Sequence, residues 1–524
     1  MNQIRFITGF RRLLISRDNN RLIKQKYPWI LTTWHTPKYG YSSNMDSVNK
    51  SDTVTDHFGG VSGSAQWPDR PWSNDVDIKS TLGLGYEDEA THAELDFENA
   101  EKAFANQSNL ELLRAMLILR ICSYNVFVNN ALKLWKIGQG ILGKRLFSSV
   151  MKATFYSQFV SGETSEEIGK TVARLSSAQI GSMLHITAED SSGCSDKEQW
   201  YNTNADGVLE CINLQTTHCD TSQQVISQIK LSSFIDTELL DKLEVVLKKN
   251  GRNFDNDSLV NYKNFAQGLD GNLQPIPELT AAENEALAAA LQRINKVAQK
   301  SVDCDFVFLV DAEYYSNCST MAMITFAMMS KFNHKKTYVW GTYQALLKET
   351  FNNLCKDGEL AKKENFGFGF KLVRGAYLET EKALALKNGF QAPTNDSYEK
   401  TNLSYNKCMD YAFNQIRNSL NGKYITMFAT HNEKSVKRVV AKMKKEGIEK
   451  KSGKVYFGQL MGMCDHVSYS LGKAGYLIHK SVPCGSIEDV MPNMSRRAIE
   501  NKSVFARLDK EKKMLSQALR KRIF

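Results

Sequence analysis

The stretch Phe368-Gly-Phe-Lys-Leu-Val-Arg-Gly-Ala-Tyr377 is a short apolar run that ends in charged, glycine and aromatic residues. A run of this length, rich in β-forming residues and containing glycine, predicts a buried strand rather than a helix. Residues 398–416, further along the chain, have the apolar spacing of a helix. A strand followed by a helix predicts one unit of a parallel sheet.

Seven more strand-length apolar runs extend this pattern in both directions. The other expected strands are Met183–Glu189, Val225–Leu231, Phe306–Glu313, Thr337–Gln344, Ile425–His431, Val455–Leu460 and Tyr476–Val482. Helical patterns lie between them, at Thr237–Lys249, Glu433–Glu446 and His466–Ala474. Eight strands alternating with helices predict an α/β fold, a distorted (βα)8 barrel of the TIM type rather than an open sheet.

Polar residues and glycines gather where these strands end. In a (βα)8 barrel the carboxyl ends of the strands carry the chemistry. Any one of the residues also has a structural reading, because Asp311 can cap a helix and His431 can be a satisfied core histidine. The prediction of a site rests on seven strand ends together, which are Lys230, Asp311 to Glu313, Tyr343-Gln344, Arg374 to Tyr377, Thr430 to Asn432, Leu460 to Met463 and Lys480-Ser481.

A helix is expected after the last strand, over residues 485–501, with Ser486 as its N-cap. We expect this C-terminal helix to lie over the barrel mouth. Asn493, Arg497 and Glu500 fall on one face, with Arg496 on its flank. Two arginines over a barrel mouth offer bidentate hydrogen bonds to a carboxylate. The alternative is a solvated pair on an exposed helix.

Four regions are expected along the chain. Residues 1–35 are interpreted as a mitochondrial transit peptide, because Met1 to Lys26 is arginine-rich and has no acid before Asp18. A disordered basic arm is the alternative. Residues 36–93 are a polar, poorly ordered leader, residues 94–177 are a helical N-terminal region, and residues 178–524 form the barrel.

Composition argues against several classes of protein. The net charge of +10 comes without a recognised nucleic-acid-binding fold, so we expect no nucleic-acid partner. The ten cysteines form no Cys-x-x-Cys pair, and no metal site is expected. The longest apolar candidate, Leu112 to Trp135, contains Arg114 and Arg120. It is a better amphipathic helix than a membrane span.

Several of these motifs, in the same order and spacing, resemble the proline dehydrogenase family. They are Leu309-Val-Asp-Ala-Glu-Tyr, Lys371-Leu-Val-Arg-Gly-Ala-Tyr-Leu, Ala429-Thr-His-Asn, Gly458-Gln-Leu-Met-Gly-Met-Cys-Asp and Ser495-Arg-Arg-Ala-Ile-Glu-Asn. The resemblance extends over residues 95–524. It implies an enzyme that removes a hydride from the ring carbon beside the nitrogen of an imino acid. The hydride passes to FAD, and the electrons pass on to a quinone.

The resemblance also assigns roles by motif position. It implies an FAD site without a Rossmann fold and a mitochondrial location on the matrix side, in peripheral contact with the inner membrane. The expected cofactor residues are Lys371, Arg374, Gly375, Ala376, Thr430, His431 and Glu500. The expected catalytic residues are Lys230, Asp311, Arg496 and Arg497, and the expected substrate-binding residues are Tyr377, Leu460, Ser481 and Asn493.

Three positions differ from the family pattern. Gly341 stands where an amide side chain is usual, and Asn493 stands where an aromatic residue is common. Ser481 replaces a tyrosine that packs against the ring in enzymes acting on plain proline, as in the hydroxyproline branch. We therefore expect trans-4-hydroxy-L-proline as substrate, with L-proline as the alternative. A degenerate barrel that only binds a ligand is a further alternative.

Overall fold

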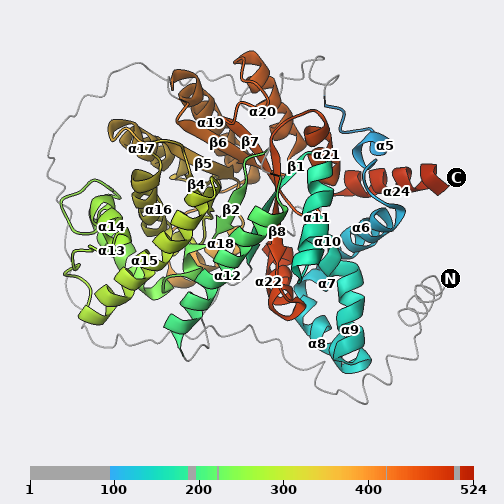
Figure 1. Ribbon diagram of the computed structural model, residues 1–524, viewed down its shortest axis with the longest axis horizontal. Coiled ribbons are helices and arrows are strands. Elements are labelled where there is room, and N and C mark those ends of the chain that lie inside the picture. The colour runs from blue at the N-terminus through green and yellow to red at the C-terminus, as the bar shows by residue number, and fades with distance from the viewer. Residues whose placement is uncertain (1–94, 187–195, 221–222, 420–421, 501–507, 524) are drawn as a thin grey trace. The chain divides into compact units, whose positions relative to one another are not determined.

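The computed structural model describes residues 95–186, 196–220, 223–419, 422–500 and 508–523 (Figure 1). All of them belong to one unit, Ser73–Phe524. The expected transit peptide and polar leader lie outside the described residues. None of the described helices is long and apolar enough to cross a membrane.

Eight parallel strands form a nearly closed barrel, which confirms the predicted fold and each predicted strand. They are β1 (Ile180–Ile186), β2 (Ile226–Ile229), β3 (Val307–Val310), β4 (Val339–Gln344), β5 (Phe368–Val373), β6 (Tyr424–Ala429), β7 (Val455–Leu460) and β8 (Ile478–Cys484). Hydrogen-bonded neighbours run in the order β1-β8-β7-β6-β5-β4-β3-β2. β1 and β2, at the two ends of this order, contact each other to complete the ring. Strands β3, β5 and β6 end earlier than expected, just before Asp311, Arg374 and Thr430.

Large side chains fill the centre of the barrel and face glycines on neighbouring strands. Trp340 is fully buried, and a Cβ on its register partner Gly369 would stand 2.2 Å from the indole. A Cβ on Gly181 would stand 2.3 Å from the ring of its partner His479. Since every second residue of a strand faces inward, these glycines make the room that the large rings need.

Helices surround the barrel between successive strands (Figure 1). The expected helix Thr237–Lys249 is found with the same bounds, and the other expected helices are found within two residues at each end. The helices that follow β1 to β7 are α12 (Lys197–His218), α13 (Thr237–Lys249), α14 (Tyr262–Leu269), α15 (Ala281–Asp303), α16 (Cys318–Phe332), α17 (Thr350–Lys363), α18 (Leu378–Asn388), α19 (Tyr398–Asn418), α20 (Glu433–Lys445) and α21 (Asp465–Lys473). The short 3-10 helices η3 (Leu231–Ser233) and η4 (Tyr315–Asn317) follow β2 and β3.

Further helices precede and follow the barrel. Before β1 lie α5 (Ala100–Ala103), α6 (Asn109–Cys122), α7 (Asn125–Asn129), α8 (Ala131–Leu142), α9 (Lys144–Met151), the π-helix η2 (Lys152–Tyr156), α10 (Ser157–Phe159) and α11 (Ser165–Ser177). After β8 come α22 (Ile487–Glu500) and α24 (Asp509–Ile523). Figure 1 shows α24 beside α5 and α6, and their apolar residues share one buried cluster. The two ends of the described chain are therefore packed together.

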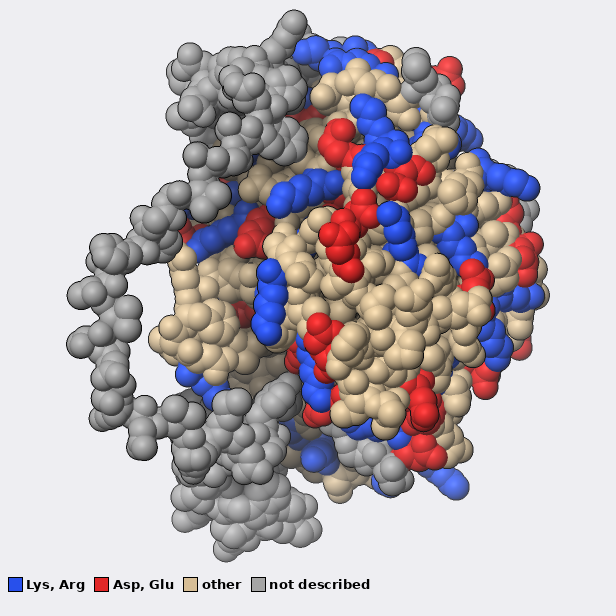
Figure 2. All heavy atoms as spheres, turned by 90° about the vertical axis from the view of Figure 1, so that its left-hand side faces the viewer, with Lys and Arg blue, Asp and Glu red and all other residues tan. Residues whose placement is uncertain are grey.

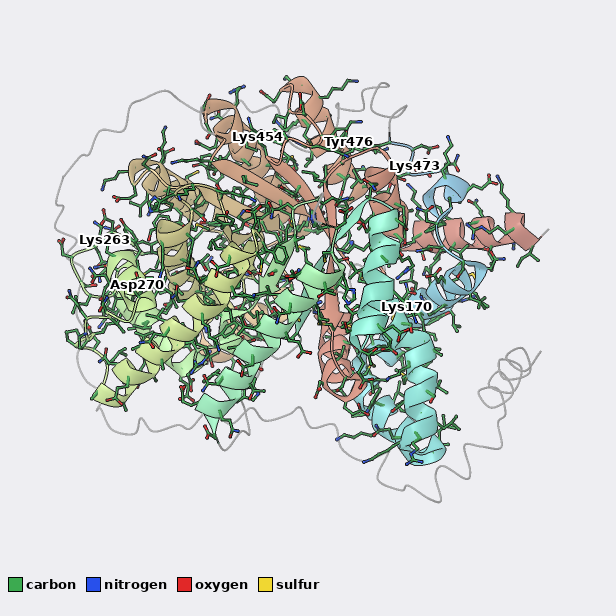
Figure 3. The ribbon with its side chains drawn as sticks, in the orientation of Figure 1. Lys170, Lys263, Asp270, Lys454, Lys473 and Tyr476 are labelled. Carbon is green, nitrogen blue, oxygen red and sulfur yellow. The ribbon has the colours of Figure 1, made fainter. Side chains whose placement is uncertain are left out.

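The outer face of the barrel carries both signs of charge. Figure 2 shows basic and acidic side chains intermingled on the side of α14 and α17. Around α14, Lys263 pairs with Asp255 at 2.7 Å and Lys331 pairs with Asp270 (Figure 3). Exposed pairs of this kind contribute about 0–1 kcal/mol each, so this face is a solvated surface rather than a source of stability.

A buried ionic cluster attaches α24 to the start of α21. Glu511 accepts the backbone N–H groups of Cys464 and Asp465 at 2.9 and 2.7 Å. His466 lies 2.9 Å from Glu433 and 3.8 Å from Glu511. Burial alone would lower the pKa of His466, but the two carboxylates outweigh it and raise that pKa to about 9. His466 is therefore a cation at neutral pH.

This cluster predicts a loss of stability in alkaline solution. The pKa of His466 is about 9 in the folded protein and ~6.5 when unfolded, so its contribution is complete below pH ~6.5 and disappears as the pH rises through 9. We expect up to about 3 kcal/mol to be lost over that range. Urea unfolding at both ends of the range measures the loss in wild type and in the His466→Gln variant, whose pH dependence should be smaller. An equal pH dependence in the two proteins would contradict the assignment.

Candidate active site

The carboxyl ends of the strands open into a large cavity. It encloses about 2210 Å³, its opening to solvent included, and residues in or directly after all eight strands line it. A water-sized sphere can fill about 530 Å³ of it, within the ~300–1,000 Å³ typical of small-molecule pockets, so the cavity has the size of a ligand site. Of the expected site residues, the cavity brings together Lys230, Asp311, Lys371, Arg374, Gly375, Ala376, Tyr377, Thr430, His431, Leu460, Ser481 and Arg497.

An ion pair crosses the cavity floor between β3 and β5. Lys371 donates to one oxygen of Asp311, and Gln228 donates to the other at 2.5 Å. Burial would raise the pKa of Asp311, but the Lys371 ammonium outweighs it and holds the pKa below its usual value. Asp311 is therefore a carboxylate at neutral pH, fixed in position from two sides.

Arg374, just after β5, is held by neutral partners. Its guanidinium donates to Asn402, Thr430 and Ser435 at 2.8–2.9 Å and lies 4.3 Å over the ring of Tyr405. No carboxylate of the described residues pairs with it, so its charge and its remaining N–H donors can serve an anionic ligand. The next residue, Gly375, has φ +113°, and a Cβ there would stand 1.8 Å from Leu346. Only glycine fits this backbone position.

The histidine at the end of β6 lines the same cavity. Burial and the nearby charge of Lys480 lower the pKa of His431 to about 3, so its ring is neutral. Its Nδ1 is buried and has no hydrogen-bond partner in the part of the chain that the structure describes. Lys480 itself faces away from the cavity, because alternate residues of β8 point outward. Its ammonium pairs with Asp465 at 2.6 Å and donates to two backbone carbonyls.

A smaller cavity of about 380 Å³ adjoins the large one beneath α22. Leu460, Ser481 and Arg497 line both cavities, and the remaining lining is methionine, phenylalanine, proline and alanine. The hydroxyl of Ser481 is buried and has no hydrogen-bond partner among the described residues. The described lining of this cavity is therefore mainly apolar, with the cation of Arg497 and the hydroxyl of Ser481.

Arg497 is positioned by a histidine that the sequence motifs did not indicate. Its Nη2 lies 3.1 Å from Nε2 of His185, near the end of β1. Burial and the charge of Arg497 lower the pKa of His185 to about 3, so the neutral ring accepts at Nε2. Its Nδ1 faces the carbonyl of Met183 at 3.4 Å. The two-residue period of a strand could have indicated this histidine, because His185 stands two residues after Met183, which faces inward.

Helix α22 begins where it was predicted. Ser486 accepts the backbone N–H of Asp489 at 3.3 Å and donates to its carboxylate at 2.5 Å, as expected of an N-cap. Asn493, Arg496 and Glu500 belong to α22, and their side chains lie outside the described part of the structure.

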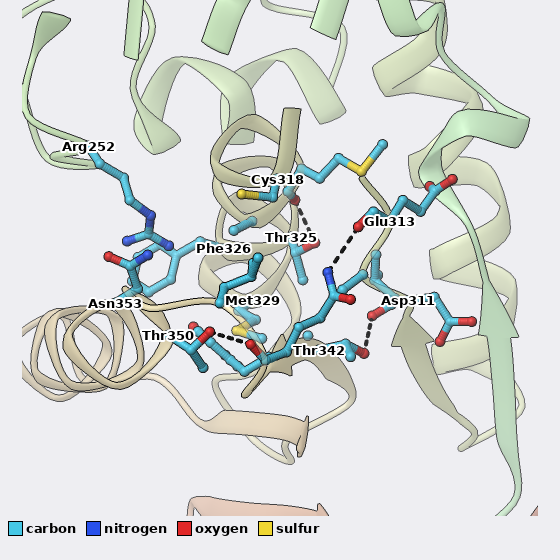
Figure 4. A pocket seen from close by; sticks show the side chains of 18 residues that line it. Arg252, Asp311, Glu313, Cys318, Thr325, Phe326, Met329, Thr342, Thr350 and Asn353 are labelled. Carbon is cyan, nitrogen blue, oxygen red and sulfur yellow. Dashed lines mark hydrogen bonds between the residues drawn. The ribbon is translucent and has the colours of Figure 1, made fainter. Parts of the chain in front are cut away.

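Gly341 does not face the barrel mouth. A Cβ on Gly341 would point toward Met329 and Thr325 of α16, in a cavity behind β4 that shares Thr342 and Gln344 with the large one (Figure 4). Gln344, three residues later in β4, lines the large cavity and donates to the carbonyl of Glu313 at 2.9 Å. An amide side chain is therefore present at the mouth on this strand, and Gly341 leaves no gap there.

Other cavity residues were also missed by sequence reasoning. Gln228 lies in an expected strand, but it was not predicted as a site residue. His466, Lys510 and Glu511 line the cavity from α21 and α24. No local pattern in α24 signals this position, because it depends on packing against distant parts of the chain. Tyr377 lines the cavity as expected, with its ring 4.5 Å from that of Tyr314.

Comparisons with known proteins agree with this geometry. A family model described as proline dehydrogenase matches residues 168–510. The chain is 37% identical to hydroxyproline dehydrogenase of Xenopus laevis over 425 residues, 80% of this chain and 89% of that protein. It is 27% identical to mitochondrial proline dehydrogenase 1 of Homo sapiens, over 82% of this chain and 90% of that protein.

Solved structures share the fold. One of them is proline utilization A (PutA) from Bdellovibrio bacteriovorus, inactivated by N-propargylglycine, with a TM-score of 0.58 and 16% identity. The match covers 84% of this chain and 44% of the bacterial one, so this chain spans less than half of that protein. At this identity the likeness supports the barrel fold.

The Asp311–Lys371 pair predicts a compensating double substitution. Lys371→Met leaves the Asp311 carboxylate buried without its counter-ion, which should destabilise the protein by about 3–5 kcal/mol. Lys371→Met combined with Asp311→Asn removes the unpaired charge and should recover most of that loss. Urea unfolding of the two single variants and the double variant measures the coupling. Additive effects would mean that the two charges do not interact.

Proposed function

The chain belongs to the proline dehydrogenase family, and on that basis we propose that it oxidises trans-4-hydroxy-L-proline, with L-proline as the alternative substrate. The product would be the corresponding 1-pyrroline-5-carboxylate. Family membership gives the reaction class, an oxidoreductase acting on a CH–NH group. The substrate, cofactor and acceptor are our proposals, and the two cavities support them.

The large cavity fits FAD by the chemistry of its lining. Arg374 offers an unpaired cation to a phosphate, and Gly375 lets a ligand approach the backbone closely. The buried, unpartnered Nδ1 of His431 offers a further polar contact. We assign Lys371, Arg374, Gly375, Ala376, Thr430, His431 and Glu500 to the cofactor. When bound, FAD supplies the two-electron oxidation of a C–N single bond.

The smaller cavity is the observation that carries the substrate proposal. A cyclic imino acid is a small apolar ring with one carboxylate, and this cavity pairs an apolar lining with Arg497. Arg497, Arg496 and Lys230 would hold the carboxylate, while Leu460, Tyr377 and Asn493 would contact the ring. Holding one end of the ring orients the reacting carbon and lowers the entropic cost of reaction.

Two neighbouring groups orient or balance the charged residues named above. The neutral ring of His185 accepts from Arg497 and so orients the guanidinium. The Asp311 carboxylate balances Lys371 on the cavity floor. We assign Asp311 to the catalytic group because it is a charged side chain that lines the large cavity and is fixed by two hydrogen bonds.

Ser481 supports hydroxyproline over plain proline. Its buried hydroxyl has no partner in the described protein, and a buried unpaired hydroxyl is costly unless a ligand satisfies it. A hydroxyl on the substrate ring would supply that hydrogen bond. The higher identity to a hydroxyproline dehydrogenase than to a proline dehydrogenase points the same way.

The cellular setting follows from the relatives. We propose a mitochondrial location on the matrix side, reached through the transit peptide at residues 1–35, because a similar protein is named as mitochondrial. Electrons would pass to a quinone at the inner membrane, with which the protein makes peripheral contact.

The reaction is tested with the purified full-length chain. We expect a yellow protein with flavin absorbance bands, and turnover of trans-4-hydroxy-L-proline with a quinone analogue as acceptor. Turnover of L-proline in preference would favour the alternative substrate. A colourless protein that binds either imino acid without oxidising it would instead identify a barrel that only binds.

Ser481→Tyr tests the choice of substrate. A tyrosine ring at this position would fill the space for a ring hydroxyl and remove its hydrogen-bond partner. The variant should lose about ten- to a hundredfold more kcat/KM for trans-4-hydroxy-L-proline than for L-proline, or roughly 1–3 kcal/mol. Steady-state kinetics on both substrates give the ratio, which cancels any general loss of activity. Ser481→Ala is the matched control for the hydroxyl alone. An unchanged ratio in Ser481→Tyr would rule out this role.

A further inference from the structure

The helices before the barrel expose an unusual amount of apolar surface. Of the twenty large apolar side chains that the described residues expose, twelve lie between Leu110 and Leu146. Helix α8 has no buried residue. We call residues 109–151, which form α6 to α9, the α6–α9 surface. A concentration of exposed apolar residues of this kind marks an interaction surface.

The exposed residues form two stripes. Leu110, Leu113 and Leu117 recur at i, i+3 and i+7 along α6, and each is at least 37% exposed. Leu134, Ile137 and Ile141 repeat the same spacing along α8, each at least 39% exposed. This spacing places each set of three on one face of its helix. Consecutive helices of the surface contact one another, from α6 to α9.

Apart from Glu111, at the start of α6 and paired with Arg174, the charges of this surface are basic. Residues 112–162 contain seven lysines and arginines and no aspartate or glutamate. Lys133 and Lys136 flank Ile137 on α8, and both are exposed. Long basic side chains beside an apolar stripe can reach phosphate groups while the stripe enters the acyl region. The other face seen in Figure 2 differs, since both signs of charge occur there.

We propose that the α6–α9 surface is where the protein lies on an anionic phospholipid bilayer, as an interfacial rather than a spanning contact. The proposal rests on the peripheral membrane contact of the proposed function and identifies the surface that makes it. Charge complementarity selects the partner, because a mainly basic and apolar face fits an anionic lipid surface. α7 and α8 also contact α22, which carries Arg497, so the bilayer would lie beside the helix that covers the smaller cavity.

Vesicle binding tests the surface in the full chain. Flotation with phosphatidylcholine vesicles, with and without phosphatidylserine, should show stronger binding of wild type to the anionic vesicles. The triple variant Leu134→Glu, Ile137→Glu, Ile141→Glu should need at least about tenfold more lipid for half-binding. Val245→Glu, Leu386→Glu, Ile523→Glu is the matched control, with the same added charge at other exposed apolar sites. It should bind as wild type does.

Hydrogen exchange on the vesicles localises the contact. Backbone amides of residues 109–151 should be protected in wild type and not in the α8 triple variant. Protection confined to other residues, or unchanged vesicle binding by the triple variant, would overturn the proposal. So would a wild type that ignores vesicles and instead dimerises through this surface, with the triple variant monomeric by light scattering.

Activity separates this proposal from the proposed function. With a soluble electron acceptor, the α8 triple variant should oxidise the imino acid at the wild-type rate. A wild type that is inactive but binds vesicles through residues 109–151 would contradict the proposed function alone.

Discussion

The barrel can open into a cavity at one end only because side chains fill its centre. Trp340, Met427 and Tyr456 lie in one buried cluster inside the ring, and glycines on adjacent strands make room for them. Gly369 of β5 faces Trp340 of β4, and Gly181 of β1 faces His479 of β8. These packed side chains form the floor of the cavity. They support the next inward-facing residues toward the carboxyl ends of the strands, among them Lys371 and Asp311. A methyl group at either glycine would press on a ring that has no free space to move into.

Charge at the mouth follows from the same geometry. Side chains that point inward at the strand ends leave bulk water, so each cation there needs a partner. The ammonium of Lys371 pairs with the carboxylate of Asp311. Lys480 points outward from β8 and pairs with Asp465. Arg374 has neutral oxygens, and Arg497 has a neutral histidine nitrogen. At Arg374 the arrangement satisfies the hydrogen bonds that orient the guanidinium without pairing its charge with a carboxylate of the described residues.

Much of this architecture was predictable because it is local. Each apolar run, such as Val307–Val310, predicts a strand. The polar residue that follows the run marks the strand end that lies at the barrel mouth. Whether a side chain points into or out of the barrel was harder to predict. The side alternates along the strand, so an error of one residue reverses every assignment. Gly341 stands where the family usually has an amide side chain, and the inward positions of this strand are Trp340, Thr342 and Gln344. His185 was missed for the same reason. Glu511 and Lys510 required knowledge of how α24 packs, which no short pattern contains.

The N-terminal helices determine where α22 lies. The carbonyl of Pro483, near the end of β8, accepts both the backbone N–H and the hydroxyl of Ser161 at 2.9 Å. The carbonyl of Gly485, just before α22, accepts the hydroxyl of Tyr156 at 2.7 Å.

These three bonds fix the turn from β8 into α22. Val490 and Met491 of α22 pack in an apolar cluster with Tyr156 and Val160, and Trp135 of α8 lies against it. One side of α22 therefore meets the helices of the α6–α9 surface, while Arg497 reaches the cavity. Since α22 is held from the N-terminal side, a change in how those helices are supported would alter the position of Arg497 before it altered the barrel.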